Sequence, residues 1–212
     1  MGVAMNGYFV TGTDTNVGKT VLSALLVAAL DAIYWKPVQT GVIEGTDRES
    51  VRSWTAVPEE QLAPEIYRFD PPVSPHLAAR QAGVRIALDS IVFPEAPAGR
   101  KWVVEGAGGV LVPINESDMM RDLMRHLGLP VVIASRTALG TINHTLLTIA
   151  ALRDAHLNVH GVVLIGEENL ENRRAIEQYG NVRLLGHIPI LKQIQRAALL
   201  ETYENYFDRQ AF

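Results

Sequence analysis

The amino-acid sequence predicts one α/β domain, a layered fold with a mostly parallel central sheet and helices on both faces. Two observations lead to this prediction. Short apolar runs alternate with longer amphipathic runs along the 212 residues, and most of the short runs are apolar on both faces. Strands of that kind are typical of parallel sheets that are covered on both sides, and strands that alternate with helices build such layers. We therefore expect a single domain over residues 1–212.

Six runs have the composition of strands. They are rich in β-branched and aromatic residues and are bounded by Gly, Pro or polar residues. In chain order they are GYFVTG (7–12), IYWKPVQT (33–40), KWVVEGAG (101–108), PVVIAS (130–135), HGVVLIG (160–166) and VRLLGHIPI (182–190).

Helix-like segments lie between and after these runs. Residues 119–128 have apolar spacing near 3.6 and end at a glycine, and Ser74 followed by Pro75 marks a helix start. Residues 56–100 are the least regular part, with seven prolines, and we expect loops with short helices there. The other predicted helices are 18–32, 142–157, 170–180 and 193–207.

Composition narrows the possible functions. The net charge is −4 with a pI near 5.9, and no basic segment indicates a nucleic-acid surface. The sequence has no cysteine, so disulfides, thiolate nucleophiles and cysteine metal sites are excluded. The longest clean apolar run has ten residues, half of what a bilayer span needs, and the N-terminus lacks a signal pattern. We expect a cytosolic protein that binds neither membranes nor nucleic acid.

The segment GTDTNVGKT, Gly12 to Thr20, predicts a phosphate-binding loop and thus a P-loop NTPase-like fold. Five residues separate Gly12 from Gly18, whereas the standard pattern allows four. The context still fits, because a strand precedes the loop and a helix follows it. Backbone N–H groups would hold phosphate oxygens, Lys19 would reach the outer phosphates, and the Thr20 hydroxyl would bind Mg²⁺.

Two charged residues follow other predicted strands. Glu105 ends an apolar strand ahead of glycines such as Gly106 and Gly108, which let backbone approach a ligand closely. Lys36 stands late in its strand, before Pro37. Ligand sites in parallel sheets lie at the carboxyl ends of strands. Glu105 could therefore face a metal and Lys36 the phosphates, although an exposed Glu and a solvated Lys remain the plain alternatives.

Asp47 has two interpretations. Thr46 and Glu49 have the spacing of a capping box, and Asp47 beside them could complement the helix dipole. Asp47 could also be a second carboxylate on Mg²⁺. The residues alone favour the capping role.

Five segments together closely resemble dethiobiotin synthetases. In order they are YFVTGTDTNVGKT, YWKPVQTG, SPHLAA, VVEGAGG and LGTINHTLLT, and the match runs from about residue 8 to 191. The loop with five spacer residues is that family's own form. The resemblance implies an ATP-dependent ligase that carboxylates 7,8-diaminononanoate with CO₂, phosphorylates the carbamate and closes the ureido ring, releasing ADP and phosphate.

The resemblance also implies residue roles. Lys36 and Lys19 match the lysines at the transferred phosphoryl group, and Thr20, Asp47 and Glu105 match the Mg²⁺ contacts, which reverses the preference for plain capping at Asp47. Thr15 and Thr40 match hydroxyls that line the substrate, with Thr40 where the family often has Ser. Nucleotide contacts fall on Asp14, Thr15, Asn16, Val17, Gly18, Lys19, Thr20, Val21, Glu105, Gly106, Gly108, Ile165, Pro189, Ile190 and Leu191.

By resemblance the protein is a homodimer with a composite active site. The segment Leu139, Gly140, Thr141, Ile142 and Asn143 opens a helix, and it would face the partner's site and hold the substrate's carboxylate tail. Backbone N–H groups at a helix start suit a carboxylate.

Two positions depart from the family pattern. Asn16 stands where many members carry Glu, and Ile165 stands where they usually have the Asn that reads adenine. Isoleucine offers no hydrogen bond, so we expect weak base discrimination, unless Asn169 or backbone near Pro189–Leu191 replaces that contact.

Three other functions compete with this interpretation. A partner-switching ATPase of the chromosome-positioning kind carries a signature lysine early in the loop, at the position of Asp14, and the aspartate here argues against that function. An amide-forming synthetase for a corrinoid side chain usually needs a cysteine nucleophile in a second domain, and this chain has none. A non-enzymatic nucleotide-binding regulator would release no phosphate in response to diamine and bicarbonate.

Overall fold

The computed structural model describes residues 5–212, which form an α/β fold around a six-stranded sheet. Every pairing in this sheet is parallel, and the strand order is β2-β5-β1-β6-β7-β8. The fold class predicted from the sequence is confirmed. The strands are β1 Gly7–Gly12, β2 Ile33–Trp35, β5 Trp102–Gly109, β6 Val131–Arg136, β7 Val159–Ile165 and β8 Leu184–Ile188.

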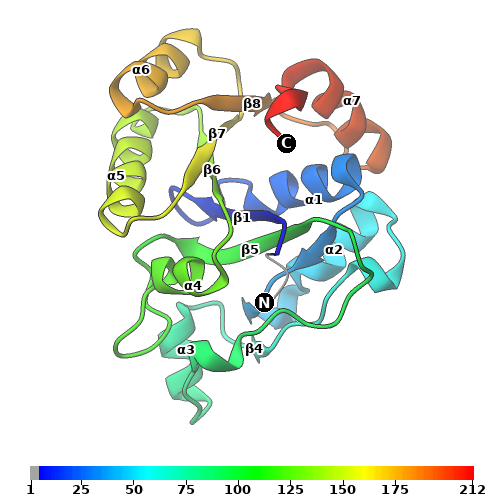
Figure 1. Ribbon diagram of the computed structural model, residues 1–212, viewed down its shortest axis with the longest axis vertical. Coiled ribbons are helices and arrows are strands. Elements are labelled where there is room, and N and C mark those ends of the chain that lie inside the picture. The colour runs from blue at the N-terminus through cyan, green and yellow to red at the C-terminus, as the bar shows by residue number, and fades with distance from the viewer. Residues whose placement is uncertain (1–4) are drawn as a thin grey trace.

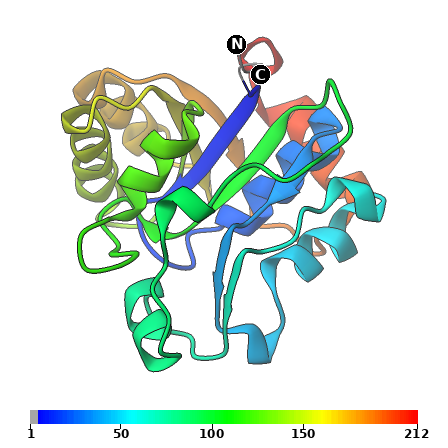
Figure 2. The same cartoon turned by 60° about the horizontal axis from the view of Figure 1, so that its bottom comes forward.

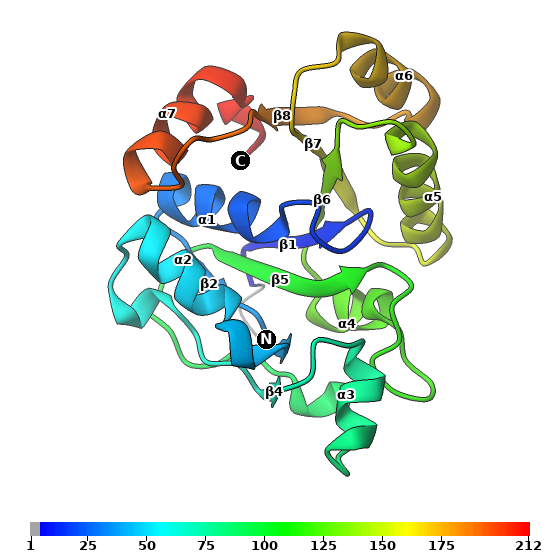
Figure 3. The ribbon, with the colours of Figure 1, turned by 180° about the vertical axis from the view of Figure 1, so that it is seen from behind.

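Helices cover both faces of the sheet. On one face α1 lies between α2 and α7 (Figures 1 and 3). On the other face α5 lies beside α6, and α4 and α3 continue that layer toward β5 (Figure 1). The helices are α1 Lys19–Leu30, α2 Asp47–Thr55, α3 Pro75–Gln81, α4 Met120–Leu127, α5 Thr141–Asp154, α6 Leu170–Gly180 and α7 Arg196–Tyr206.

The alternation of side chains along each strand explains the two cores. Phe9 and Val104 point into the cluster under α4 and α5, whereas Val10 and Val103 point into the cluster under α1 and α7. Successive residues of a strand face opposite sides, and here both sides are buried. The near-continuous apolar strands of the sequence follow from this arrangement.

One predicted strand is broken in the structure. Residues 33–40 were expected to be continuous, but β2 ends at Trp35, and β3 (Val38–Thr40) pairs instead with β4 (Tyr67–Phe69) in a separate two-stranded sheet. Pro37 lies at the break, because proline has no N–H to continue a ladder. Its carbonyl accepts hydrogen bonds from Ile66 and Tyr67 instead.

The strands place all their carboxyl ends at one edge of the sheet, where the loops after β1, β5, β6, β7 and β8 gather. The opposite edge holds the start of β1 and the C-terminal segment side by side (Figure 2), with the Tyr8 hydroxyl 3.3 Å from the Phe212 carbonyl. Within residues 5–212, no helix combines the length and apolar character needed to cross a bilayer.

Candidate active site

The predicted phosphate loop joins β1 to α1. Gly18 begins the helix with a φ of 95°, a left-handed conformation that favours glycine. A Cβ atom at Gly18 would also lie 2.8 Å from Cδ1 of Ile165, so a larger residue would require that side chain to shift. Val17 is buried in the core below and anchors the loop. Asn16 has a φ of 57° at the exposed tip, a conformation that asparagine tolerates better than most residues.

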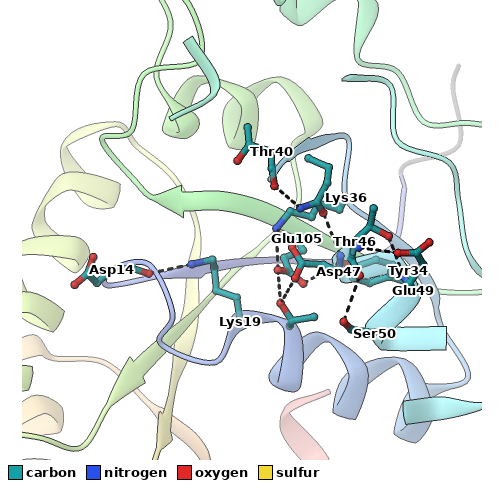
Figure 4. A network of polar contacts seen from close by, with 12 residues as sticks. Asp14, Lys19, Tyr34, Lys36, Thr40, Thr46, Asp47, Glu49, Ser50 and Glu105 are labelled. Carbon is teal, nitrogen blue, oxygen red and sulfur yellow. Dashed lines mark hydrogen bonds and ion pairs between the residues drawn. The ribbon is translucent and has the colours of Figure 1, made fainter. Parts of the chain in front are cut away.

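Lys19 folds back over this loop. Its Nζ donates to the Asp14 carbonyl at 2.9 Å (Figure 4). Burial lowers the pKa of Lys19, and the nearby charge of Glu105 opposes that shift. The Asp14 side chain pairs with Arg136 at the end of β6, with Oδ2 and Nη2 2.9 Å apart. Thr15 stays exposed beside Asp14, and its N–H donates to the Asp14 carboxylate.

Four polar side chains that are distant in sequence meet beside the loop. The Thr20 hydroxyl lies 2.9 Å from Oδ1 of Asp47 and 2.9 Å from Oε1 of Glu105. Lys36 Nζ lies 2.6 Å from Oδ2 of Asp47 and 3.1 Å from Oε1 of Glu105. Figure 4 shows the two carboxylates converging between Lys36 and the start of α1. The structure thus brings together the three proposed metal contacts and the proposed catalytic lysine.

The electrostatics of this cluster depend on pairing. Lys36 is 5% exposed and Glu105 1%, and charges so deeply buried require compensating partners. Burial by itself lowers the pKa of Lys36, but the charges of Glu105 and Asp47 outweigh it, and the net shift is upward. Burial also opposes ionisation of Asp47, yet the Lys36 ammonium holds the pKa of Asp47 below its usual value. Lys36 is therefore a cation at neutral pH.

The capping box at α2 leaves Asp47 available to the site. Thr46 Oγ1 accepts from the Glu49 N–H, and the Glu49 carboxylate accepts from the Thr46 N–H. Both capping contacts are made by these two residues, as their spacing predicted. The Asp47 carboxylate faces Thr20 and Lys36 instead.

Sequence reasoning missed two buried residues around this cluster. The Tyr34 hydroxyl donates to Oε2 of Glu105 at 3.0 Å. The Gln39 side chain accepts from the Asp47 N–H at 3.3 Å and donates to the Thr40 carbonyl at 2.8 Å. One signal could have found Tyr34: it stands two positions before Lys36, and residues two apart in a strand share a face.

The glycines after Glu105 have structural roles of their own. A Cβ atom at Gly106 would lie 2.9 Å from the Phe9 ring, and one at Gly108 would lie 2.7 Å from Val112. Both positions are therefore restricted by packing within the fold, whatever approaches from outside.

The start of α5 is part exposed and part internal. Leu139, Gly140 and Asn143 are exposed, whereas Ile142 packs partly against the core. Thr141 is buried, and its hydroxyl donates to the Arg136 carbonyl and lies 2.9 Å from Ser135 Oγ. No side chain caps the helix at Gly140.

The loops after β7 and β8 close the far side of the edge. Ile165 lies beside Gly18. Asn169 is the N-cap of α6, and its side-chain oxygen accepts a hydrogen bond from the Asn172 N–H at 2.9 Å. Ile190 is exposed between Pro189 and Leu191. Val21 lies half-buried in the first turn of α1.

Comparison with known proteins identifies the family. A family model described as an AAA domain matches residues 6–198. A protein of Paramagnetospirillum magneticum named ATP-dependent dethiobiotin synthetase BioD is 49% identical, over 92% of this chain and 93% of its own length. Proteins of the same name from Rhodopseudomonas palustris strain HaA2 and Novosphingobium aromaticivorans are each 46% identical, over 96% and 98% of this chain. The chain belongs to the ATP-dependent dethiobiotin synthetase family.

A solved structure agrees at the level of the fold. The nucleotide-binding protein from Archaeoglobus fulgidus, in complex with ADP, has a TM-score of 0.50 at 14% identity, over 94% of this chain and 89% of its own. Membership of the dethiobiotin synthetase family decides against the partner-switching ATPase, the corrinoid synthetase and the non-enzymatic regulator.

The donor set of this dethiobiotin synthetase fits Mg²⁺. Carboxylate and hydroxyl oxygens are the ligands that Mg²⁺ takes from proteins, usually one or two carboxylates beside phosphates and waters. Asp47 and Glu105 point oxygens at the same hydroxyl of Thr20. Within residues 5–212, no group of three His, Cys, Asp or Glu could enclose a metal. The cluster therefore suits an ion that brings its remaining ligands with it.

Proposed function

We propose that this chain makes dethiobiotin from 7,8-diaminononanoate, CO₂ and ATP, and that the cluster of Thr20, Lys36, Asp47 and Glu105 carries the phosphoryl transfer. The observation that supports the proposal is that these four side chains meet beside a phosphate loop. Thr20 and Lys36 each contact both carboxylates, and each of these four contacts is 3.1 Å or shorter. Family membership supplies the reaction.

The reaction has three balanced steps. One amine of the substrate adds to CO₂ and loses a proton, which gives a carbamate. A carbamate oxygen attacks the γ-phosphorus of ATP, ADP leaves, and a carbamic–phosphoric anhydride forms. The second amine then attacks the carbamate carbon, phosphate leaves with the electron pair of the C–O bond, and loss of a proton completes the cyclic urea.

Lys36 and Lys19 stabilise charge in the second step. Phosphoryl transfer relies on positioning and on cations aimed at the equatorial oxygens. Lys36 is held protonated by its two carboxylates, and Lys19 needs only to exchange its contact with the Asp14 carbonyl for a phosphate oxygen. Thr15 and Thr40 would line the substrate from the loop and from the end of β3.

Thr20, Asp47 and Glu105 would hold Mg²⁺. When bound, the ion neutralises phosphate charge and orients the triphosphate. In a crystal with Mg²⁺ and nucleotide, we expect the side-chain oxygens of Thr20, Asp47 and Glu105 at about 2.0–2.1 Å from the metal. A metal well away from Asp47 would return that residue to a role at the helix start.

The active site would be completed by a second subunit. Leu139, Gly140 and Asn143 are exposed, and the first N–H groups of α5 have no side-chain cap, so a substrate carboxylate from the partner's site could accept from them. Leu147 is exposed one turn further along α5 and extends this face.

A direct assay tests the proposed reaction. Purified protein is incubated with ATP, Mg²⁺, bicarbonate and 7,8-diaminononanoate, and the product is detected by mass. The expected result is a cyclic urea formed with one phosphate per turnover. Phosphate release that is unaffected by the diamine, with no urea, would overturn the proposal.

A further inference from the structure

The two oxygens of the buried Glu105 carboxylate have different surroundings. Oε1 lies 2.9 Å from the Thr20 hydroxyl and 3.1 Å from Lys36 Nζ. Oε2 points the other way and lies 3.0 Å from the Tyr34 hydroxyl. One oxygen thus faces the phosphate loop, and the other faces the interior of the protein.

Tyr34 is placed by the sheet rather than by the site. It lies in the middle of β2, paired with Val103 of β5, and its side chain is fully buried in the cluster under α1. Glu105 is two positions beyond Val103 on the same strand and shares its face. A phenol buried among apolar side chains needs a partner for its hydroxyl, and here that partner is Glu105.

A carboxylate rotates less freely when a hydrogen bond from a buried side chain holds one of its oxygens. The terminal torsion of Glu is otherwise broad and roughly two-fold. The hydrogen bond from Tyr34 holds the plane of the Glu105 carboxylate so that Oε1 stays aimed at Thr20. Partners of this kind behind a metal ligand commonly change metal affinity or activity by about 10–100-fold when they are removed.

We propose that Tyr34 is a positioning residue that orients Glu105 toward Mg²⁺. The inference rests on the proposed function, in which Glu105 contacts the ion bound with the nucleotide. Tyr34 touches neither substrate nor metal in this role, and it acts only through the carboxylate.

Tyr34→Phe is the test, because it removes the hydroxyl and keeps the ring. ADP affinity is measured by calorimetry, first with chelator and then over a series of Mg²⁺ concentrations. Without metal we expect ADP affinity within about twofold of wild type, since the phosphate loop is intact. The Mg²⁺ concentration that gives half of the metal-dependent gain in affinity is expected to rise about tenfold or more.

Two comparisons separate positioning from a purely structural role. Tyr8→Phe removes a partly buried hydrogen bond at the opposite edge of the sheet, from the Tyr8 hydroxyl to the Phe212 carbonyl. This variant should leave the dependence of ADP affinity on Mg²⁺ unchanged. In a Glu105→Gln background, Tyr34→Phe should produce no further shift, because the carboxylate that it orients is gone.

Each outcome decides one statement. A folded Tyr34→Phe protein that loses thermal stability but keeps the wild-type Mg²⁺ curve overturns the inference and leaves the proposed reaction intact. If the ADP affinity of the wild-type protein does not change with Mg²⁺ concentration, both the inference and the proposed metal site are overturned. If Tyr34→Phe does not fold, Tyr34→4-aminophenylalanine keeps a donor in place. It should retain the wild-type curve, and a tenfold shift would contradict the role of the donor.

Discussion

The carboxyl edge of the sheet has two halves that are built differently. Over β2, β5 and β1, buried charged groups contact one another, with Lys36 between Asp47 and Glu105. Over β6, β7 and β8, the edge presents the exposed start of α5, the Ile165 side chain and short loops. The first half is a buried charge cluster within this chain, and the second presents exposed backbone, apolar and charged groups, among them Arg136 and Glu168.

We infer that the first half carries the chemistry and the second half the recognition of the base and of a partner subunit. A buried charge cluster is interdependent, since removal of one member leaves another charge without compensation. An exposed surface tolerates change at single positions better. We therefore expect large effects on turnover from the first half and smaller effects, on assembly and nucleotide choice, from the second.

The largest effect is expected for Lys36→Ala. Turnover should fall about 10²-fold or more, because a cation aimed at the transferring phosphoryl group is lost. Nucleotide affinity should change less, since Lys19 remains. Steady-state kinetics and calorimetry measure the two quantities. Lys101→Ala, which removes a cation at the opposite edge, is the control, and near-normal turnover of Lys36→Ala would remove Lys36 from the mechanism.

Assembly is expected to fail when charge is placed on the exposed face of α5. Asn143 and Leu147 lie four residues apart on one side of α5, and Leu139 is exposed in the turn just before the helix; Leu147 is 60% exposed. Ile142 at the start of the same helix is a poorer target, because it packs partly against the core and a charge there would confuse assembly with folding. Leu147→Asp should weaken dimerisation by about 2 kcal/mol, roughly thirtyfold, and lower activity in parallel.

Sedimentation and activity are compared over the same protein concentrations. Leu170→Asp is the matched control, since Leu170 is 51% exposed at the start of α6. Full activity of wild-type protein or of Leu147→Asp at a concentration where sedimentation shows a monomer would contradict the composite site.

Base selectivity should be weak and adjustable. Ile165 provides no hydrogen bond, and the side-chain oxygen of Asn169 is engaged as the cap of α6, so neither side chain offers adenine both a donor and an acceptor. Each lost hydrogen bond removes about 0.5–1.5 kcal/mol. We expect CTP or GTP to be used with a specificity constant within about tenfold of that for ATP.

Ile165→Asn sharpens this test. It should raise the preference for ATP by about tenfold, the value of one or two neutral hydrogen bonds, whereas Val92→Asn, at an exposed apolar residue outside the predicted nucleotide contacts, should not. A wild-type preference for ATP above about a thousandfold would show that another group reads the base.

The smallest effect is expected for Gln39→Leu. Gln39 bridges Asp47 and Thr40 through neutral hydrogen bonds, so turnover should fall between about twofold and tenfold. Gln61→Leu is the control, because Gln61 is equally buried but bonds to Asp31 at the far end of α1. Equal losses of turnover in both variants would indicate a general loss of stability.

Part of the first half of the edge could be predicted from the sequence, and part could not, for physical reasons. The phosphate loop has a local pattern, and the ends of parallel strands must share an edge, so Lys36 and Glu105 could be placed near it. The contact of Asp47 with Thr20 spans 27 positions and depends on how α2 packs, which no local pattern reveals. Tyr34 looked like any apolar strand residue, and the break at Pro37 was concealed by the apolar run around it.

The contact between Ile165 and Gly18 has a thermodynamic consequence. The Ile165 side chain lies beside Gly18 in the phosphate loop, and Val17 is buried in the core below that loop. A loop clamped before its ligand arrives loses little conformational entropy on binding, and such preorganisation strengthens affinity without new contacts. Nucleotide binding would then depend less on the identity of the base and more on the shape of the phosphate loop.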